Sequence, residues 1–74
     1  MAFEVREVVL NKEPVELYKI LKFEGLVGSG GEAKSVIEQG LVKVNDQQEM
    51  RKRRKLVAGD VIVFDDQRLL LTVN

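Results

Sequence analysis

The sequence lacks the residues from which most enzyme and metal sites are built. Its 74 residues include no cysteine, no histidine and no tryptophan. Without cysteine the chain forms neither a disulfide framework nor a thiolate site, and without histidine it lacks the commonest neutral-pH base and metal ligand. We therefore expect no catalytic residue, no metal site, no cofactor and no small-molecule substrate.

Long hydrophobic runs are also absent. The longest uninterrupted apolar run is the four residues Val61–Phe64, whereas a membrane-spanning helix needs about 20. Glu4 and Glu7 interrupt the region where a signal peptide would lie. These features predict a cytoplasmic protein without membrane contact, and the short length predicts one domain over residues 1–74, which we expect to be a monomer.

The chain has no excess of charge of either sign overall, but individual segments do. The chain has 12 Lys and Arg residues and 12 Asp and Glu residues, so its net charge is zero. Residues 1–32 and 56–74 each carry a net charge of −2, while residues 33–55 carry +4. Such an uneven distribution produces a polarised field that attracts a polyanion to one face.

Two helices are predicted in the first half of the chain, after a strand. Apolar and polar residues alternate at the start of residues 3–10, which indicates a short strand. Pro14 fits the first turn of a helix that ends at Gly25. The apolar face of this helix would contain Leu17, Ile20, Leu21 and Phe23.

The second predicted helix has clear signals at both ends. Ser29 and Glu32 have the spacing of a capping box. In this motif the hydroxyl and the carboxylate each accept a hydrogen bond from a backbone N–H at the helix start that has no partner within the helix. Gly40 follows the helix and can adopt the positive φ of a C-terminal cap. One face of the helix would present Ala33, Val36 and Ile37.

The remainder of the chain has the shorter period of strands and turns. We expect a strand over residues 41–44, a turn at Asn45-Asp46, a return arm over residues 48–55, and strands over residues 61–64 and 69–73. Helices that precede the strands indicate the α+β class. The predicted fold is two N-terminal helices packed on a small, mainly antiparallel sheet, with an extra N-terminal strand.

The strongest functional signal is a run of five consecutive cations, Arg51, Lys52, Arg53, Arg54 and Lys55. A regular strand would point one set of these charges into the core, so we expect an exposed loop or edge strand that can grip phosphates. A solvated edge that prevents sheet association is the alternative. Arginine forks match phosphate oxygens, which favours binding, and the exposed arginines should be replaceable by alanine without loss of the fold.

A second signal lies at the start of the second helix. Gly28, Gly30 and Gly31 precede or open this helix, where free N–H groups and the helix dipole can hold an anion, and Lys34 would stand near it. The glycines could equally ease a tight helix entry, and Lys34 could be an ordinary surface lysine.

Other polar and aromatic residues are assigned structural roles. Asp60, Asp65 and Asp66 lack the spacing of a calcium loop and are interpreted as turn residues. Tyr18 and Phe23 are too few for a platform that stacks bases, so we expect both to pack in the core.

Several ordered segments resemble a known family. They are Ser29-Gly-Gly-Glu-Ala-Lys34, Ile37-x-x-Gly40, Val42-Lys-Val-Asn45, Glu49-x-Arg-Lys-Arg-Arg-Lys55 and Ala58-Gly-Asp-Val-Ile62. Together they resemble the RNA-binding domain of the ribosomal protein S-four type, most closely its small stand-alone YbcJ-like bacterial family. The resemblance implies the α-α-β-β core of the alpha-L type. The RNA-facing positions that it implies are Ser29, Gly30, Gly31, Lys34, Lys43, Asn45, Arg51, Lys52, Arg53, Arg54 and Lys55.

Two positions depart from the family pattern. Gly30 stands where the wider family usually has a basic residue, so a side-chain phosphate contact is missing there. Asp46 stands where the family usually has glycine, which places an acid near the implied surface. Lys34 or backbone N–H groups would have to replace the missing contact.

The resemblance implies a non-catalytic protein that contacts the phosphate backbone and shape of structured RNA, either ribosomal or transfer RNA. Larger relatives attach the domain to a pseudouridine synthase or a tRNA synthetase, and this chain is too short for such a partner domain. The alternative is a protein-interaction module that docks its basic segment on an acidic partner. Nucleic acid that co-purifies with the protein would distinguish the two hypotheses.

Overall fold

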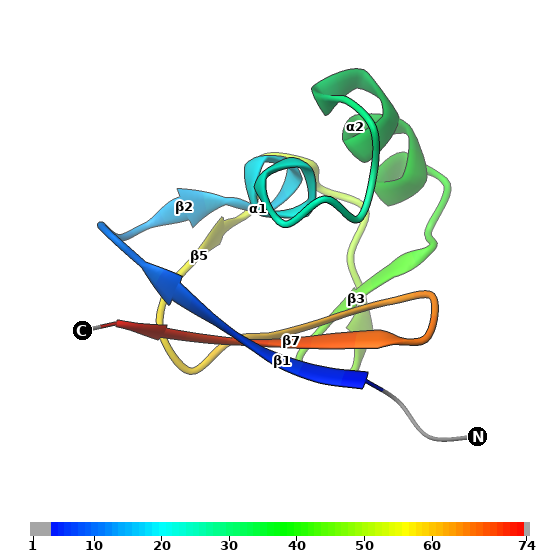
Figure 1. Cartoon of the computed structure of the whole chain (residues 1–74). Coiled ribbons are helices and arrows are strands. Elements are labelled where there is room, and N and C mark those ends of the chain that lie inside the picture. Colours follow the sequence, from blue (N-terminus) through cyan, green and yellow to red (C-terminus); the bar gives the residue numbers. More distant parts are fainter. Residues whose placement is uncertain (1–3, 74) are drawn as a thin grey trace.

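Two helices lie over one face of a five-stranded sheet in the computed structural model, which describes residues 4–73 (Figure 1). The elements are β1 (Glu4–Leu10), β2 (Val15–Glu16), α1 (Leu17–Phe23), α2 (Gly30–Glu38), β3 (Val42–Val44), β4 (Gln47–Gln48), β5 (Lys55–Leu56), β6 (Val61–Phe64) and β7 (Gln67–Val73). The large sheet has the order β1-β7-β6-β3-β4, and β2 pairs with β5 in a separate ladder. None of the helices described is long and apolar enough to cross a membrane.

The sheet is mainly antiparallel, as predicted, but one parallel pair makes it mixed. β7, β6, β3 and β4 are neighbours in antiparallel pairs, but β1 runs parallel to β7, with Val8 opposite Leu71. The predicted α+β class with two helices and a strand before them is present, although Phe3, the predicted first residue of that strand, lies outside the described residues. Short-range patterns could not show the parallel pairing, because it joins the two ends of the chain.

The core lies between the helices and the inner face of the sheet. Alternate strand residues face the helices, so β3 buries Val42 and Val44 while Lys43 stays exposed. The buried apolar side chains are Val8, Leu10, Leu17, Ile20, Leu21, Val27, Ala33, Ile37, Val42, Val44, Leu56, Ile62, Leu69 and Leu71. This arrangement leaves the other sheet face without a helix among residues 4–73 (Figure 1).

The first helix begins later than predicted. Pro14 does not lie in its first turn, because Val15–Glu16 form β2 and α1 starts at Leu17. The N–H groups of Leu17 and Tyr18 donate to the carbonyl oxygens of Arg54 (2.9 Å) and Lys52 (3.1 Å). Carbonyls that are distant in sequence thus satisfy the free N–H groups of this helix end, which no local pattern could reveal.

Phe23 is not a core residue, contrary to prediction. It is 69% exposed, whereas Leu17, Ile20 and Leu21 are buried. Residues four apart lie nearly in line on a helix, so Phe23 follows the exposed Lys19 and stands at the edge of the buried face that Leu17, Ile20 and Leu21 form. Tyr18 is half-buried and packs against the core, as expected.

The second helix begins as predicted. The Glu32 N–H donates to Ser29 Oγ (3.1 Å), and the Glu32 carboxylate accepts from the Gly28 N–H (2.8 Å). The carboxylate therefore reaches one residue further back than in the usual capping box. Gly40 has φ of 80° after the last turn, which confirms its place as the C-terminal cap.

The hairpin after Gly40 is tight, but its return arm is short. Asn45 (φ 53°) and Asp46 (φ 68°) are both left-handed, as in a type I′ turn. The expected arm over residues 48–55 is wrong, because β4 covers only Gln47–Gln48 before the chain leaves the sheet. The departing segment crosses to the start of α1, where the Arg54 and Lys52 carbonyls accept the hydrogen bonds described above.

Candidate functional site

The run of five cations forms a loop that is held against α1. We call Arg51–Lys55 the basic loop. Its first four residues make a turn in which the Arg54 N–H donates to the Arg51 carbonyl (3.1 Å), and Lys55 enters β5. Because its carbonyls accept hydrogen bonds from the first N–H groups of α1, the backbone of the loop is fixed against this helix.

One buried carboxylate anchors this loop. Glu49 is only 5% exposed, and its oxygens accept from the Arg51 N–H (2.9 Å), Arg51 Nε (3.0 Å) and Arg54 Nη1 (2.8 Å). Hydrogen bonds from Arg51, then from Arg54, outweigh the effect of burial and lower the pKa of Glu49 to about 2. Sequence reasoning missed this role, although Glu49 opens the family-like segment that contains both arginines, because its burial depends on the docking of the loop.

The arginines of the basic loop are therefore not equivalent. Arg51 and Arg54 compensate a buried charge, and the Arg54 side chain is only 30% exposed. Replacing both by alanine would leave Glu49 buried without its partners. The prediction that the loop arginines are replaceable without loss of the fold thus applies to Arg53 alone.

Other loop cations reach across to the helices. Lys52 Nζ lies 3.1 Å from a Glu38 oxygen near the end of α2. Arg53 lies 3.3 Å from Glu16, which also pairs with Lys19 at 3.2 Å. Lys19 first, and also Arg53, hold the pKa of Glu16 below its ordinary value. The Lys52 and Arg53 side chains are 39% and 59% exposed. Ion pairs of such accessible cations contribute little to stability, so Lys52 and Arg53 can exchange these partners for a ligand.

Cations from three elements gather around Tyr18. Lys34 Nζ of α2 lies 4.7 Å from the ring centroid, Arg53 Cζ of the basic loop 5.5 Å, and Lys19 Nζ of α1 6.0 Å. We call Lys19, Lys34 and Arg53 the Tyr18 cluster. The negative face of an aromatic ring attracts cations at these distances, which holds like charges together that would otherwise separate.

The start of α2 lies beside the Tyr18 cluster. A Cβ atom placed on Gly30 would be 4.0 Å from the Tyr18 ring and 3.9 Å from the Lys22 side chain. Within residues 4–73, the N–H groups of Gly30 and Gly31 have no acceptor, while Ser29 Oγ and the Ser29 carbonyl accept from Glu32 and Ala33. Two free donors at the positive end of the helix dipole thus open next to the cluster.

Two of the implied positions lie elsewhere. Lys43 is exposed on the sheet face away from the helices, between the buried Val42 and Val44. Asn45 is engaged within the fold, because its amide nitrogen donates to Asp60 (3.0 Å) and its oxygen accepts from the Val61 N–H (3.0 Å). Asp46 occupies the left-handed position that glycine usually takes and is exposed. The structure thus unites the start of α2, Lys34 and Arg53 but separates Lys43 and Asn45 from them.

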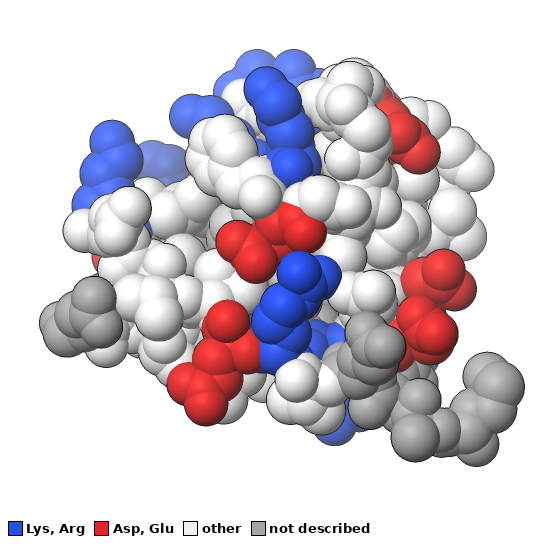
Figure 2. All heavy atoms as spheres, viewed as in Figure 1, with Lys and Arg blue, Asp and Glu red and all other residues white. Residues whose placement is uncertain are grey.

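The distribution of charge follows this arrangement. Figure 2 shows Lys and Arg side chains gathered along the top and upper left, on the side of the helices, while the basic side chains lower on this face lie among acidic ones. Of the +4 segment, Lys34 and Arg53 come together at Tyr18 on a molecule without net charge, whereas Lys43 lies on the other sheet face. A polyanion would be attracted to the helix side.

Comparisons with known proteins agree on one family. A family model described as "S4 domain" matches residues 8–72. YbcJ of Escherichia coli (strain K12) is 50% identical over 56 residues, which cover 74% of this chain and 80% of YbcJ. RlbA of Bacillus subtilis (strain 168), named "Probable ribosome maturation protein", is 36% identical over 67 residues. These residues cover 90% of this chain and 94% of RlbA.

A solved structure and a larger enzyme are also similar. The solution structure of YbcJ from E. coli, described as revealing an alpha-L motif involved in RNA-binding, has a TM-score of 0.66 and 35% identity over 97% of this chain and 90% of that one. The tyrosine–tRNA ligase of Bordetella pertussis is 38% identical over 71 residues, which are 96% of this chain but 17% of the ligase.

Proposed function

This chain belongs to the S4 domain family, and from that membership we propose that it is a non-catalytic RNA-binding protein. The similarity to YbcJ supports the proposal, since the YbcJ structure is described by its RNA-binding motif. The similarity to the tyrosine–tRNA ligase covers only 17% of that enzyme, so the ligase's activity does not transfer to this chain. The unit that we propose to bind RNA is one monomeric domain over residues 1–74, acting in the cytoplasm.

The observation that carries the proposal is the Tyr18 cluster beside the open start of α2. Three cations from three elements surround one ring, and two backbone donors that have no acceptor within residues 4–73 lie next to them. Double-stranded RNA is recognised largely by its shape, phosphates and 2′-hydroxyl groups. A rigid group of cations and helix-end donors suits phosphates whose spacing a folded RNA has already set.

We assign distinct roles within this surface. The N–H groups of Gly30 and Gly31 bind one phosphate, with Ser29 capping the helix that presents them. Lys34 and Arg53 contact neighbouring phosphates, and Lys52 and Lys55 extend the surface along the basic loop. Arg51 and Arg54 act through Glu49 by holding the loop in place. Lys43 and Asn45, on other sides of the fold, stay outside the central contact.

Ribosomal or transfer RNA is the ligand class that the comparisons favour. RlbA carries ribosome maturation in its name, and the matched ligase acts on a tRNA by its name. Both RNAs are folded and present double-stranded segments with regular phosphate spacing. Recruitment to such an RNA, without catalysis, is the activity that we propose.

The test is a charge-removal variant of the Tyr18 cluster. Lys34→Gln combined with Arg53→Gln should weaken binding to a labelled RNA hairpin, and the slope of log K against log salt should become shallower by about 1.4–1.8, since each phosphate contact contributes about 0.7–0.9. Fluorescence titrations at several salt concentrations measure both quantities. Wild-type affinity and slope in this double variant would contradict the assignment.

Lys43→Gln is the matched comparison. It removes one positive charge from the opposite face, so it shows how much of the change comes from net charge alone. We expect it to alter the slope less than either single replacement in the Tyr18 cluster. Thermal unfolding of all variants shows whether the fold is retained.

A further inference from the structure

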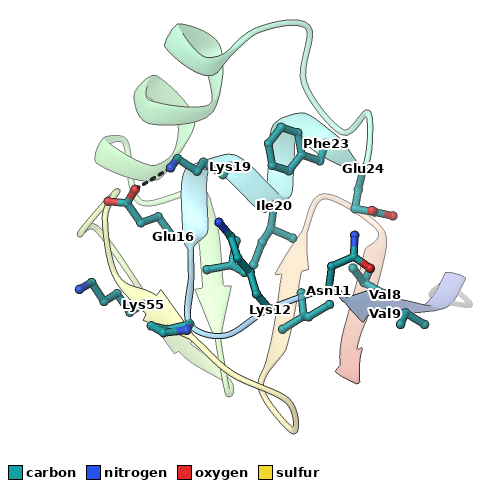
Figure 3. A pocket seen from close by; sticks show the side chains of 13 residues that line it. Val8, Val9, Asn11, Lys12, Glu16, Lys19, Ile20, Phe23, Glu24 and Lys55 are labelled. Atoms are coloured by element: carbon teal, nitrogen blue, oxygen red, sulfur yellow. Dashed lines mark ion pairs between the residues drawn. The ribbon is translucent and has the colours of Figure 1, made fainter. Parts of the chain in front are cut away.

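A groove of about 730 Å³ lies on the far side of α1 from α2 (Figure 3). It is bounded by the end of β1, the outward face of α1 and the β2–β5 ladder, and its lining includes Val8, Leu10, Val15 and Ile20. This volume lies within the range of about 300–1,000 Å³ that is typical of small-molecule sites. The assigned phosphate contacts leave this groove unexplained.

An exposed aromatic ring stands at the groove. Phe23 lines it and is 69% exposed, on the same face of α1 as Lys19. In Figure 3, Phe23 and Lys55 lie at opposite sides of the groove, with Lys19 and Lys12 between them. An accessible phenyl ring beside apolar side chains offers a surface on which a planar, apolar group can stack.

The groove also contains cations that form no ion pair with a described carboxylate. Lys12, Lys19 and Lys55 line it together with Glu16 and Glu24. Glu16 is paired with Lys19 and Arg53, and Glu24 faces Arg6 at 4.0 Å. Among the side chains that the structure describes, no carboxylate lies within 4.0 Å of the Lys12 or Lys55 ammonium.

The groove is continuous with the proposed RNA surface. Lys19 belongs both to the Tyr18 cluster and to the groove lining, and Glu16 joins the groove to Arg53. Lys55, which lines the groove, is the last residue of the basic loop. A polyanion held at the Tyr18 cluster can therefore extend around α1 into the groove without crossing an uncompensated acidic side chain.

We propose that this groove binds an unpaired nucleotide next to the structured part of the RNA, with its base against Phe23 and its phosphates at Lys12 and Lys55. The inference rests on the proposed RNA-binding function and adds a single-stranded subsite to it. A nucleotide combines the two features that the groove offers to a ligand, a planar base and a negative charge. Base stacking on an aromatic side chain is tolerant of sequence, so the subsite would accept any of the bases.

The test compares two RNAs that differ only in an unpaired end. One is a blunt hairpin, and the other is the same hairpin with a single-stranded extension of about four nucleotides, made at either end in turn. For the wild-type chain, one of the extensions should raise affinity at least about fivefold, the lower end of what one stacked base contributes. Phe23→Ala should abolish most of this gain while leaving affinity for the blunt hairpin unchanged.

Two further variants make the result specific. Lys12→Gln should reduce the gain and its salt dependence, because it removes a phosphate partner from the groove only. Leu41→Ala is the matched control, since Leu41 is another exposed apolar residue and does not line the groove. It should retain the full gain.

Three results would overturn the inference. They are wild-type affinity that neither extension raises, a gain that survives Phe23→Ala, and a gain that Leu41→Ala removes equally. If the wild-type chain fails to bind the blunt hairpin, the proposed function itself fails. Binding to the blunt hairpin thus tests RNA binding itself, and the gain from the extension tests the subsite in the groove.

Discussion

Glu49 is the one buried charged side chain among residues 5–73, for which burial is described, and its two arginine partners give the basic loop its shape. A buried carboxylate that accepts several hydrogen bonds favours its ionised form. The same bonds leave the Arg51 side chain 75% exposed, so the loop is anchored from beneath while its outer surface stays cationic. Arg51 and Arg54 therefore hold the loop in place, whereas Arg53 is the loop arginine that we assign to RNA.

The anchor makes stability depend on pH. The pKa of Glu49 falls from its ordinary 4.5 to about 2 in the folded chain, so its contribution is complete above about pH 4.5 and is lost as the pH falls towards 2. Glu49→Gln should lower the free energy of unfolding at neutral pH by about 1.5–3 kcal/mol, the usual contribution of hydrogen bonds to a charged group. Urea unfolding of both proteins between pH 7 and about pH 2 measures the difference.

The difference in free energy of unfolding between wild type and Glu49→Gln should become smaller as the pH falls from 7 to about 2. Glu38→Gln is the control, because Glu38 pairs with Lys52 on the surface and is 56% exposed. We expect it to change stability by less than about 0.5 kcal/mol at any pH. A Glu49→Gln gap that stays constant from pH 7 to pH 2 would show that Glu49 is not the titrating group.

Among individual residues, local signals were predictable and partner choices were not. Ser29 and Gly40 were identified from the sequence because capping needs only neighbours in the chain. Phe23 was misassigned because a helix of seven residues gives too few positions to define its buried face. The partners of Glu49 are only two and five residues away, but its burial depends on where the basic loop docks, which no spacing encodes.

At the scale of elements, the α2 start joins stability to the proposed phosphate site. Ser29 Oγ accepts the Glu32 N–H at 3.1 Å, and this bond fixes the first turn that presents the Gly30 and Gly31 donors. Ser29→Ala should reduce the free energy of unfolding by about 1 kcal/mol, as is typical for loss of an N-cap. Thermal or urea unfolding measures this loss directly.

Ser35→Ala makes the same chemical change within the same helix. Among the described residues, Ser35 Oγ accepts only from the exposed Gln39 side chain (2.8 Å), so we expect a change within about 0.5 kcal/mol. Equal effects of the two substitutions would mean that the Ser29 cap does not stabilise α2. A loss of RNA affinity in Ser29→Ala alone would in addition connect the cap to the phosphate site.

The pairing of elements shows where sequence reasoning reached its limit. The helices, the hairpin turn at Asn45-Asp46 and the strand over residues 61–64 follow local patterns, and each is present. The parallel pairing of β1 with β7 joins residues more than 60 positions apart, as in Val8 and Leu71. The β2–β5 ladder likewise brings Val15 to Leu56, and it depends on the same docking of the basic loop.

For the whole molecule, zero net charge conceals a cationic side. The sequence showed the excess of positive charge in residues 33–55, but the structure changes which cations act together. Lys19, which lies outside that segment, joins Lys34 and Arg53 at Tyr18, whereas Lys43 lies on the opposite face. The folded surface therefore differs from the one that charge counting alone would assign.

The most direct test of the central claim is a titration of the wild-type chain into a labelled RNA hairpin and a DNA duplex of equal length, each at two or more salt concentrations. Tighter binding to the RNA, with a log–log salt slope of about −3 to −5 for four to six phosphate contacts, is the predicted result. Equal and weak binding to both nucleic acids would contradict the account, and the cationic surface would then be general charge.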